Sequence, residues 1–167
     1  MSFIKNDITA LSGDVFQKIG NEWMLITAQK DGKVNTMTAS WGGVGVLWGE
    51  NVAFVFIRPQ RYTFEFTENT DYMTLSFFGG KYKKELGYLG TKSGRDEDKI
   101  SNVSFHIADV DGHPSFEEAE TVLVCRKLYA DVLKEDCFVD REMLGNYTAG
   151  DYHRVYVVKI ESVYTKA

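Results

Sequence analysis

The residues with the clearest chemical potential form a hydroxyl-rich stretch, NTMTASW, at residues 35–41. Because side chains alternate between the two faces of a strand, its three hydroxyls share one face, namely Thr36, Thr38 and Ser40. Hydroxyls beside exposed backbone suit a ligand with many carbonyl and ring-nitrogen acceptors. Glycines at positions 42, 43 and 45 follow, and glycine in a strand region often marks a close approach to the backbone. A half-exposed strand with threonines toward solvent explains the pattern about equally well.

A second stretch, RPQRYT at residues 58–63, has the residue types of a phosphate site. A strand is predicted to end at Arg58, and a helix is predicted to begin near Arg61 and Thr63. The N-terminus of a helix offers unpaired N–H groups, and an arginine fork with a hydroxyl would complete a recess for a phosphate. Two arginines on a solvated turn are the commoner explanation of such a pattern.

A third stretch, GTKSGRDEDK at residues 90–99, places basic residues before acidic ones around a glycine. Such a loop could form a nest for an anion, in which the acidic residues fix the arginine. A charged surface turn accounts for the same residues and is favoured on pattern alone.

Composition and charge limit the classes of function. The chain has 167 residues with 44% hydrophobic content, which suits one domain with a real core over residues 1–167. Its net charge of -5 gives no general basic field, so nucleic acid and anionic membrane surfaces are disfavoured as partners. The N-terminal MSFIKNDITAL lacks the apolar core of a signal peptide, and no apolar run reaches transmembrane length. We therefore expect a cytoplasmic protein.

The elements that must position these stretches are mainly strands. Runs rich in Tyr, Phe, Val and Thr predict strands at residues 22–29, 35–41, 51–58, 71–78, 121–129 and 153–164. Six strands in one chain suggest a barrel or a sandwich. The Asp31-Gly32 pair predicts a tight turn that joins the first two strands in antiparallel fashion. Helical spacing at residues 61–69 and 80–90 predicts short helices beside the sheet.

Histidines and cysteines do not form a recognisable reactive or metal-binding pattern. His106, His113 and His153 are scattered, and DVDGH at residues 109–113 lacks the length and the other ligands of a calcium loop. Cys125 lies in an apolar alternation that predicts a buried, unreactive thiol. We therefore expect no metal site.

Four segments together resemble the flavin reductase-like family of FMN-binding split-barrel proteins, in particular its flavoredoxin-like branch. They are NTMTASWGG, FIRPQRYTFEF, TLSFF and GTKSGRDEDKI, and FEEAETVLVCRKLYA and GDYHRVYVVKIESV extend the resemblance over most of the chain from Ile19 onward. The resemblance implies a mainly β fold, a six-stranded antiparallel Greek-key split β-barrel with a few short peripheral helices. It also implies a homodimer that holds FMN near the subunit interface, each site drawing on both chains.

The resemblance also implies a set of FMN-binding residues. The isoalloxazine ring would lie against Asn35, Thr36, Met37, Thr38, Ala39, Ser40 and Trp41. The ribityl phosphate would be held at Arg58, Arg61, Tyr62 and Thr63, which agrees with the residue types discussed above. A strand under the cofactor would contribute Ser76 and Phe77, and a loop near the flavin or its phosphate would contribute Lys92 and Ser93, with Arg95 beside them. His153 matches a family histidine, although a histidine that opens a strand is more often structural.

The redox chemistry of such a protein belongs to its flavin, and the protein tunes it by hydrogen bonds and charge. The resemblance implies an oxidoreductase that passes electrons from NAD(P)H or a protein donor through FMN to an acceptor. An FMN-binding electron-transfer protein without NAD(P)H oxidation of its own is the alternative, and a redox protein would then be its partner. The chain has no GxGxxG followed by a suitably placed acidic residue, so NAD(P)H would have to lie directly against the flavin. A binding barrel without cofactor is the third hypothesis.

Overall fold

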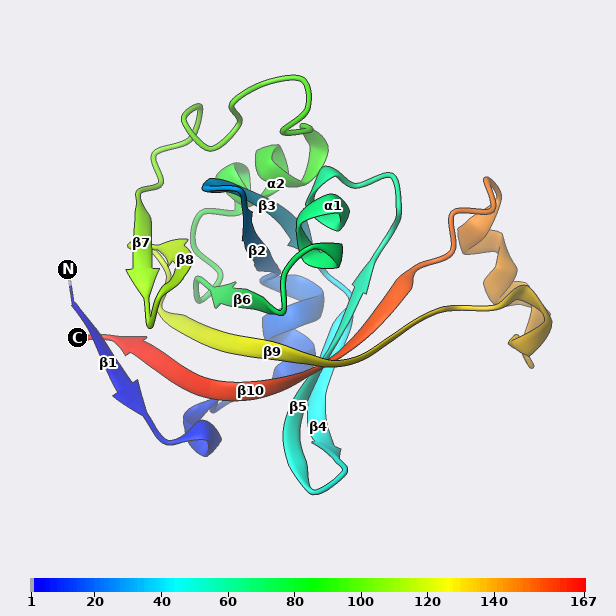
Figure 1. Ribbon diagram of the computed structural model, residues 1–167, viewed down its shortest axis with the longest axis horizontal. Helices are drawn as coiled ribbons and strands as arrows, with labels where there is room; N and C mark the ends of the chain where they lie inside the picture. The colour runs from blue at the N-terminus through cyan, green and yellow to red at the C-terminus, as the bar shows by residue number, and fades with distance from the viewer. Residues whose placement is uncertain (1) are drawn as a thin grey trace.

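A curved antiparallel sheet is the main feature of the computed structural model, which describes residues 2–167 (Figure 1). Within those residues the sheet contains eight strands: β1 (Phe3–Asn6), β2 (Met24–Lys30), β3 (Lys33–Ala39), β4 (Gly42–Leu47), β5 (Glu50–Ile57), β6 (Tyr72–Phe77), β9 (Thr121–Val132) and β10 (Arg154–Lys166). The order is β3-β2-β6-β9-β10-β5-β4, and β1 pairs with β10. A separate hairpin pairs β7 (Ile107–Val110) with β8 (His113–Phe116).

The two longest strands, β9 and β10, run side by side through the middle of the molecule (Figure 1). Their register shifts between Val157 and Val158 and again between Ile160 and Ser162. Such irregularities bend a strand and increase its twist. The bend lets β10 pair with β5 at one end and with β1 at the other.

Two short helices, α1 (Tyr62–Glu68) and α2 (Lys83–Thr91), pack near strands β2 and β3. Near the N-terminus lie a 3₁₀ turn, η1 (Ile8–Ala10), and a π-helical turn, η2 (Gln17–Asn21). The 3₁₀ turns η3 (Glu135–Cys137) and η4 (Arg141–Tyr147) belong to an arm, residues 133–153, that projects from the sheet between β9 and β10 (Figure 1).

Both faces of β2 and β3 are covered, which explains why polar residues of β3 are buried. Met24 and Ile26 of β2 belong to one apolar cluster, whereas Leu25 belongs to a second cluster that includes residues of α2. Thr36 is fully buried between these layers, and its hydroxyl donates to the Ile26 carbonyl at 3.1 Å and lies 2.9 Å from the Thr27 hydroxyl. A buried hydroxyl that is hydrogen-bonded in this way carries little energetic cost.

The predicted mainly β, antiparallel fold with a few helices is confirmed, and each of the six predicted strands and both predicted helices has a counterpart. The predicted number of strands was wrong, because β1 and β4 join the sheet and β7 and β8 form their own hairpin. The missed β4, GGVGVL, begins with two glycines, which strand propensities disfavour. Its pairing with residues 50–55 of β5 stabilises it instead.

Candidate functional site

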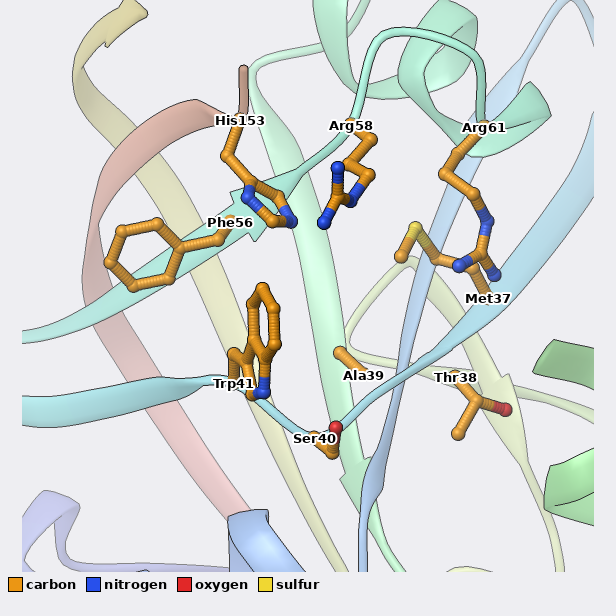
Figure 2. Close-up of a pocket in the computed structure, with 9 residues that line it drawn as sticks. All are labelled: Met37, Thr38, Ala39, Ser40, Trp41, Phe56, Arg58, Arg61 and His153. Carbon is orange, nitrogen blue, oxygen red and sulfur yellow. The ribbon is translucent and has the colours of Figure 1, made fainter. Parts of the chain in front are cut away.

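The predicted hydroxyl-rich stretch and the predicted arginines line one cavity, of about 150 Å³, which we call the β3 cavity. Its walls are Met37, Thr38, Ala39, Ser40, Trp41, Phe56, Arg58, Arg61 and His153. Figure 2 shows residues 37–41 along one side and the two arginines with His153 along the other. Residues 37–41 come from the end of β3 and the turn into β4, Phe56 comes from the end of β5, Arg58 and Arg61 come from the segment between β5 and α1, and His153 directly precedes β10.

Arg58 is held in place by the projecting arm. Its guanidinium donates to the Asp151 carboxylate at 2.6 Å and to the Asn146 carbonyl at 2.9 Å, and it lies 4.9 Å from the Tyr147 ring centre. Hydrogen bonds from Gln60 first, and from Arg58, lower the pKa of Asp151. The charge of Arg58 is therefore largely neutralised by its salt bridge with Asp151, and this salt bridge connects the arm to the wall of the β3 cavity.

His153 presents an uncharged imidazole to the β3 cavity. The side chain is 6% exposed, its Nδ1 lies 2.7 Å from the Tyr147 hydroxyl, and its ring meets the Trp41 ring edge-on at 5.3 Å. Burial, and then the charge of Arg58, lower the pKa of His153 to about 4. At neutral pH the imidazole is thus a polar but uncharged group beside the two arginines.

We expect His153 to remain neutral in the folded protein down to about pH 4. Because its pKa is lowered from 6.5 to about 4, the unfolded chain binds a proton between these pH values that the folded chain does not bind. The free energy of unfolding should therefore fall as the pH drops through this window, and His153→Gln should remove that part of the slope. Imidazole NMR titration measures the pKa directly, and a value near 6.5 would contradict this prediction.

The hydroxyls of residues 36–40 differ in whether they can still form a hydrogen bond with a ligand. Thr38 donates its proton to the Leu86 carbonyl of α2 at 2.5 Å, so its oxygen can only accept a further hydrogen bond. Ser40 lies where the chain turns from β3 toward β4, and it lines the cavity. Thr36 does not, because its hydroxyl is engaged in the core. The predicted hydroxyl face therefore reduces to Thr38 and Ser40.

A second cavity, of about 170 Å³, lies at the start of α1, and we call it the α1 cavity. Its walls are Gln60, Arg61, Tyr62, Thr63, Gly90, Thr91, Lys92, Ser93 and Lys99. Three of these are cationic, and among the described residues no acidic side chain lines it. The donor set suits an anion with several oxygen acceptors.

Arg61 lies between the two cavities and lines both of them. Within residues 2–167, its Nη2 is the one buried side-chain nitrogen or oxygen that has no hydrogen-bond partner. No salt bridge joins Arg61 to a carboxylate within the same residues. A buried guanidinium nitrogen without a partner is costly, so this arrangement indicates a position where a ligand supplies the acceptor.

A tightly packed support fixes the wall of the α1 cavity. The buried Asn35 amide donates to the Thr63 hydroxyl at 2.8 Å, which ties β3 to the first turn of α1. Gly94 packs against this amide, because a Cβ atom there would lie only 2.3 Å from Asn35 Oδ1 and 3.0 Å from the Tyr62 ring. Asn35 lines neither of the two cavities, and its contribution to the α1 cavity is to hold the Thr63 side chain in place.

Most of the predicted FMN-binding residues are brought together at the two cavities. Seven line the β3 cavity (Met37, Thr38, Ala39, Ser40, Trp41, Arg58 and Arg61), and Tyr62, Thr63, Lys92 and Ser93 join Arg61 around the α1 cavity. Arg58 was predicted to hold the ribityl phosphate together with Arg61, but it lines the β3 cavity and not the α1 cavity. Ser76 pairs with Ser115 at 2.9 Å and Phe77 belongs to the core, so neither lines these cavities.

Besides His153, five residues that line these cavities were not among the predicted FMN-binding residues, namely Phe56, Gln60, Gly90, Thr91 and Lys99. Lys99 is buried against the α1 cavity, although a lysine in the charged run at residues 90–99 reads as a solvated side chain. Phe56 lines the β3 cavity, and the sequence marks it only as one residue of a predicted strand. Nothing local in the sequence distinguishes either residue. Arg95, in contrast, forms a salt bridge with Glu65 on the surface.

A comparison with protein-family models matches residues 16–167 to the flavin reductase like domain. The chain belongs to the flavin reductase-like family. No curated protein sequence is significantly similar to this chain. Within residues 2–167, no helix is both long and apolar enough to cross a membrane, and no group of three or more His, Cys, Asp or Glu side chains could hold a metal ion.

Solved structures of flavin reductase-like proteins have the same fold. An FMN-binding domain of flavin reductases-like enzyme from Shewanella baltica superposes with a TM-score of 0.70 at 14% identity, over 98% of this chain and 77% of that one. Flavoredoxin from Methanosarcina acetivorans gives 0.65 at 22% identity, over 86% and 68%. The styrene monooxygenase flavin reductase from Pseudomonas putida gives 0.64 at 13% identity, over 86% and 78%. At these identities the likeness confirms the split-barrel fold class.

Proposed function

We propose that this protein binds FMN across the two cavities and acts as an FMN-dependent oxidoreductase. The observation that carries the proposal is Arg61, whose buried Nη2 lacks a partner at the boundary of the β3 and α1 cavities. FMN has an aromatic ring at one end and an anionic phosphate at the other, joined by a short chain. Such a ligand fits one partly apolar cavity next to one cationic cavity. Family membership supports the same ligand.

The α1 cavity is the proposed seat of the FMN phosphate. Arg61 Nη2 would donate to a phosphate oxygen, and Thr63 retains its own hydroxyl proton for donation because it accepts from Asn35. Lys92 and Lys99, which line the same cavity, add positive charge, and Ser93 adds a neutral hydroxyl. Charge-assisted hydrogen bonds of this kind are the strong ones, particularly where water is largely excluded.

The β3 cavity is the proposed seat of the isoalloxazine ring. Its apolar surface comes from Met37, Trp41 and Phe56, which suits a flat aromatic system. The Thr38 oxygen is restricted to accepting, so it would take a hydrogen bond from a ring N–H. Bound FMN would supply the redox chemistry, and the chain would hold it and set its surroundings. Asp151 offsets the charge of Arg58, and the neutral His153 adds none.

A second copy of the chain is the proposed partner, as an extension of the same proposal. Support comes from large apolar side chains left exposed beside the β3 cavity, where Trp41 is 50% exposed and Phe16 is 89% exposed. A cavity of about 550 Å³ lies between these two residues. Light scattering of the purified protein would test this proposal, and a monomer at micromolar concentration would contradict it. A cytoplasmic location stays a prediction from the sequence.

Two measurements test the proposed function. Titration of the protein into FMN should quench the flavin fluorescence with saturation at micromolar protein, and failure to quench would contradict the proposal. Anaerobic addition of NADH or NADPH to the complex then separates the two classes of function. Loss of the visible flavin absorbance would identify the nicotinamide nucleotide as electron donor. If the absorbance persists with both nucleotides but is lost with a chemical reductant, the alternative electron-transfer protein is correct.

A further inference from the structure

Lys99 is a buried cation in the wall of the α1 cavity. Its side chain comes from the loop after α2 and is only 3% exposed. Its Nζ donates to the Leu89 carbonyl at 2.7 Å and to the Lys92 carbonyl at 3.0 Å. An ammonium group has three N–H donors, so one remains available on the side of the cavity.

The charged groups around Lys99 leave this cation without a carboxylate partner. On its own loop, Glu97 accepts hydrogen bonds from Tyr88 and Asn102, and Asp98 accepts two from Ser101. The other charged residues that line the α1 cavity are cations, namely Arg61 and Lys92. Lys33 is a further cation, and it lines a separate cavity together with Lys99 and Asp98. Among residues 2–167, no salt bridge includes Lys99.

Burial of an unpaired ammonium beside a guanidinium makes its proton easy to lose. Burial first, and then the charge of Arg61, lower the pKa of Lys99 to about 8, although Glu97 acts in the opposite direction. In the free protein, Lys99 therefore changes from charged to neutral near the upper end of the physiological pH range. Arg61 keeps its charge throughout this range.

We infer that Lys99 is the residue that makes the α1 cavity selective for a dianionic phosphate monoester, and that it links flavin binding to uptake of a proton. This inference rests on the proposed function. A phosphate monoester supplies acceptors for the free N–H of Lys99 and for the orphan Nη2 of Arg61 at once. Riboflavin has the same ring but no phosphate, so it leaves both groups unpaired.

The inference gives a definite pH dependence for FMN affinity. A bound dianion stabilises the charged form of Lys99, so binding above pH 8 requires the protein to take up a proton. FMN affinity should change by no more than about twofold between pH 7 and 8, because the second pKa of a phosphate monoester is about 6 and Lys99 is still at least half charged. Above pH 8 it should fall by up to about tenfold per pH unit. Riboflavin affinity should not follow this curve.

Fluorescence titrations of FMN and riboflavin between pH 7 and 10 test the inference with the unmodified chain. The expected result is a ratio of FMN affinity to riboflavin affinity that falls above pH 8. A ratio that stays constant through pH 10 would overturn the inference while leaving the proposed function intact. Failure of the protein to bind FMN at all would contradict the proposed function, and the inference with it.

A pair of lysine substitutions separates a role in phosphate binding from a purely structural role. Lys99→Met should weaken FMN binding by about 10- to 100-fold, leave riboflavin binding within about threefold, and abolish the fall of the affinity ratio above pH 8. Lys84→Met, on the exposed part of α2, should behave as the unmodified chain. An equal loss of affinity for both flavins in Lys99→Met would mean that Lys99 only holds the end of α2 in place, and would overturn the inference.

Discussion

Replacing Arg61 with methionine is expected to weaken FMN binding by about 100-fold while changing riboflavin binding by less than about threefold. Arg61 Nη2 is buried and without a partner, so a phosphate there forms a charge-assisted hydrogen bond worth about 1.5 to 3 kcal/mol, with further attraction between the charges. Methionine keeps most of the apolar length of the side chain and removes the charge. Fluorescence titration with both flavins measures the two affinities.

The same substitution should not destabilise the free protein, although it weakens FMN binding. Because a buried guanidinium nitrogen without an acceptor is unfavourable, Arg61→Met should leave the free energy of unfolding of the unliganded protein unchanged or higher. Arg95→Met is the matched control, since Arg95 lies over the ring of Tyr62, beside Arg61 in the chain, but is already paired with Glu65 at the surface. Equal weakening of FMN binding in both variants would contradict the assignment of the phosphate to Arg61.

Replacing Gly94 with alanine is expected to lower the free energy of unfolding by about 2 to 4 kcal/mol. The added Cβ would lie 2.3 Å from Asn35 Oδ1, and the buried Asn35 cannot move without breaking its hydrogen bond to Thr63. Overpacking of this kind costs about 1 to 3 kcal/mol, and the lost hydrogen bond adds about 1 kcal/mol. Denaturant unfolding followed by tryptophan fluorescence measures the change.

Gly87→Ala provides the control for this substitution. Gly87 lies in α2 with no atom within 4 Å of the position of an added Cβ, so alanine should raise the free energy of unfolding by about 0.5 to 1 kcal/mol. Gly94→Ala should also weaken FMN binding, because Thr63 and Tyr62 line the α1 cavity. If both variants unfold alike, Asn35 is not constrained by Gly94.

The arrangement of strands was largely predictable because the apolar alternation of the chain is strong. The Asp31-Gly32 turn fixes the pairing of β2 with β3, and its glycine has a φ of 76°, which only glycine adopts easily. β4 was not predictable, because its glycines leave few side chains to signal a strand and its formation depends on β5. The short strands β7 and β8 depend in the same way on each other.

The candidate site was predictable in its arginines and in the end of β3, but not in its detail. The alternation of residues 35–41 predicts one face with three available hydroxyls. In the structure Thr36 donates its proton to the Ile26 carbonyl in the core, and Thr38 donates its proton to the Leu86 carbonyl of α2. Such contacts come from segments far away in sequence, which local pattern does not encode. Lys99 could not be predicted for the same reason, because its buried position depends on contacts with the Leu89 and Lys92 carbonyls at the end of α2.

A crystal structure of the protein with FMN tests the central claim most directly. We expect the ring against Met37 to Trp41, and the phosphate within about 3 Å of both Arg61 Nη2 and Lys99 Nζ. A phosphate beside Arg58 with the α1 cavity unused, or a ring outside the β3 cavity, would contradict the claim.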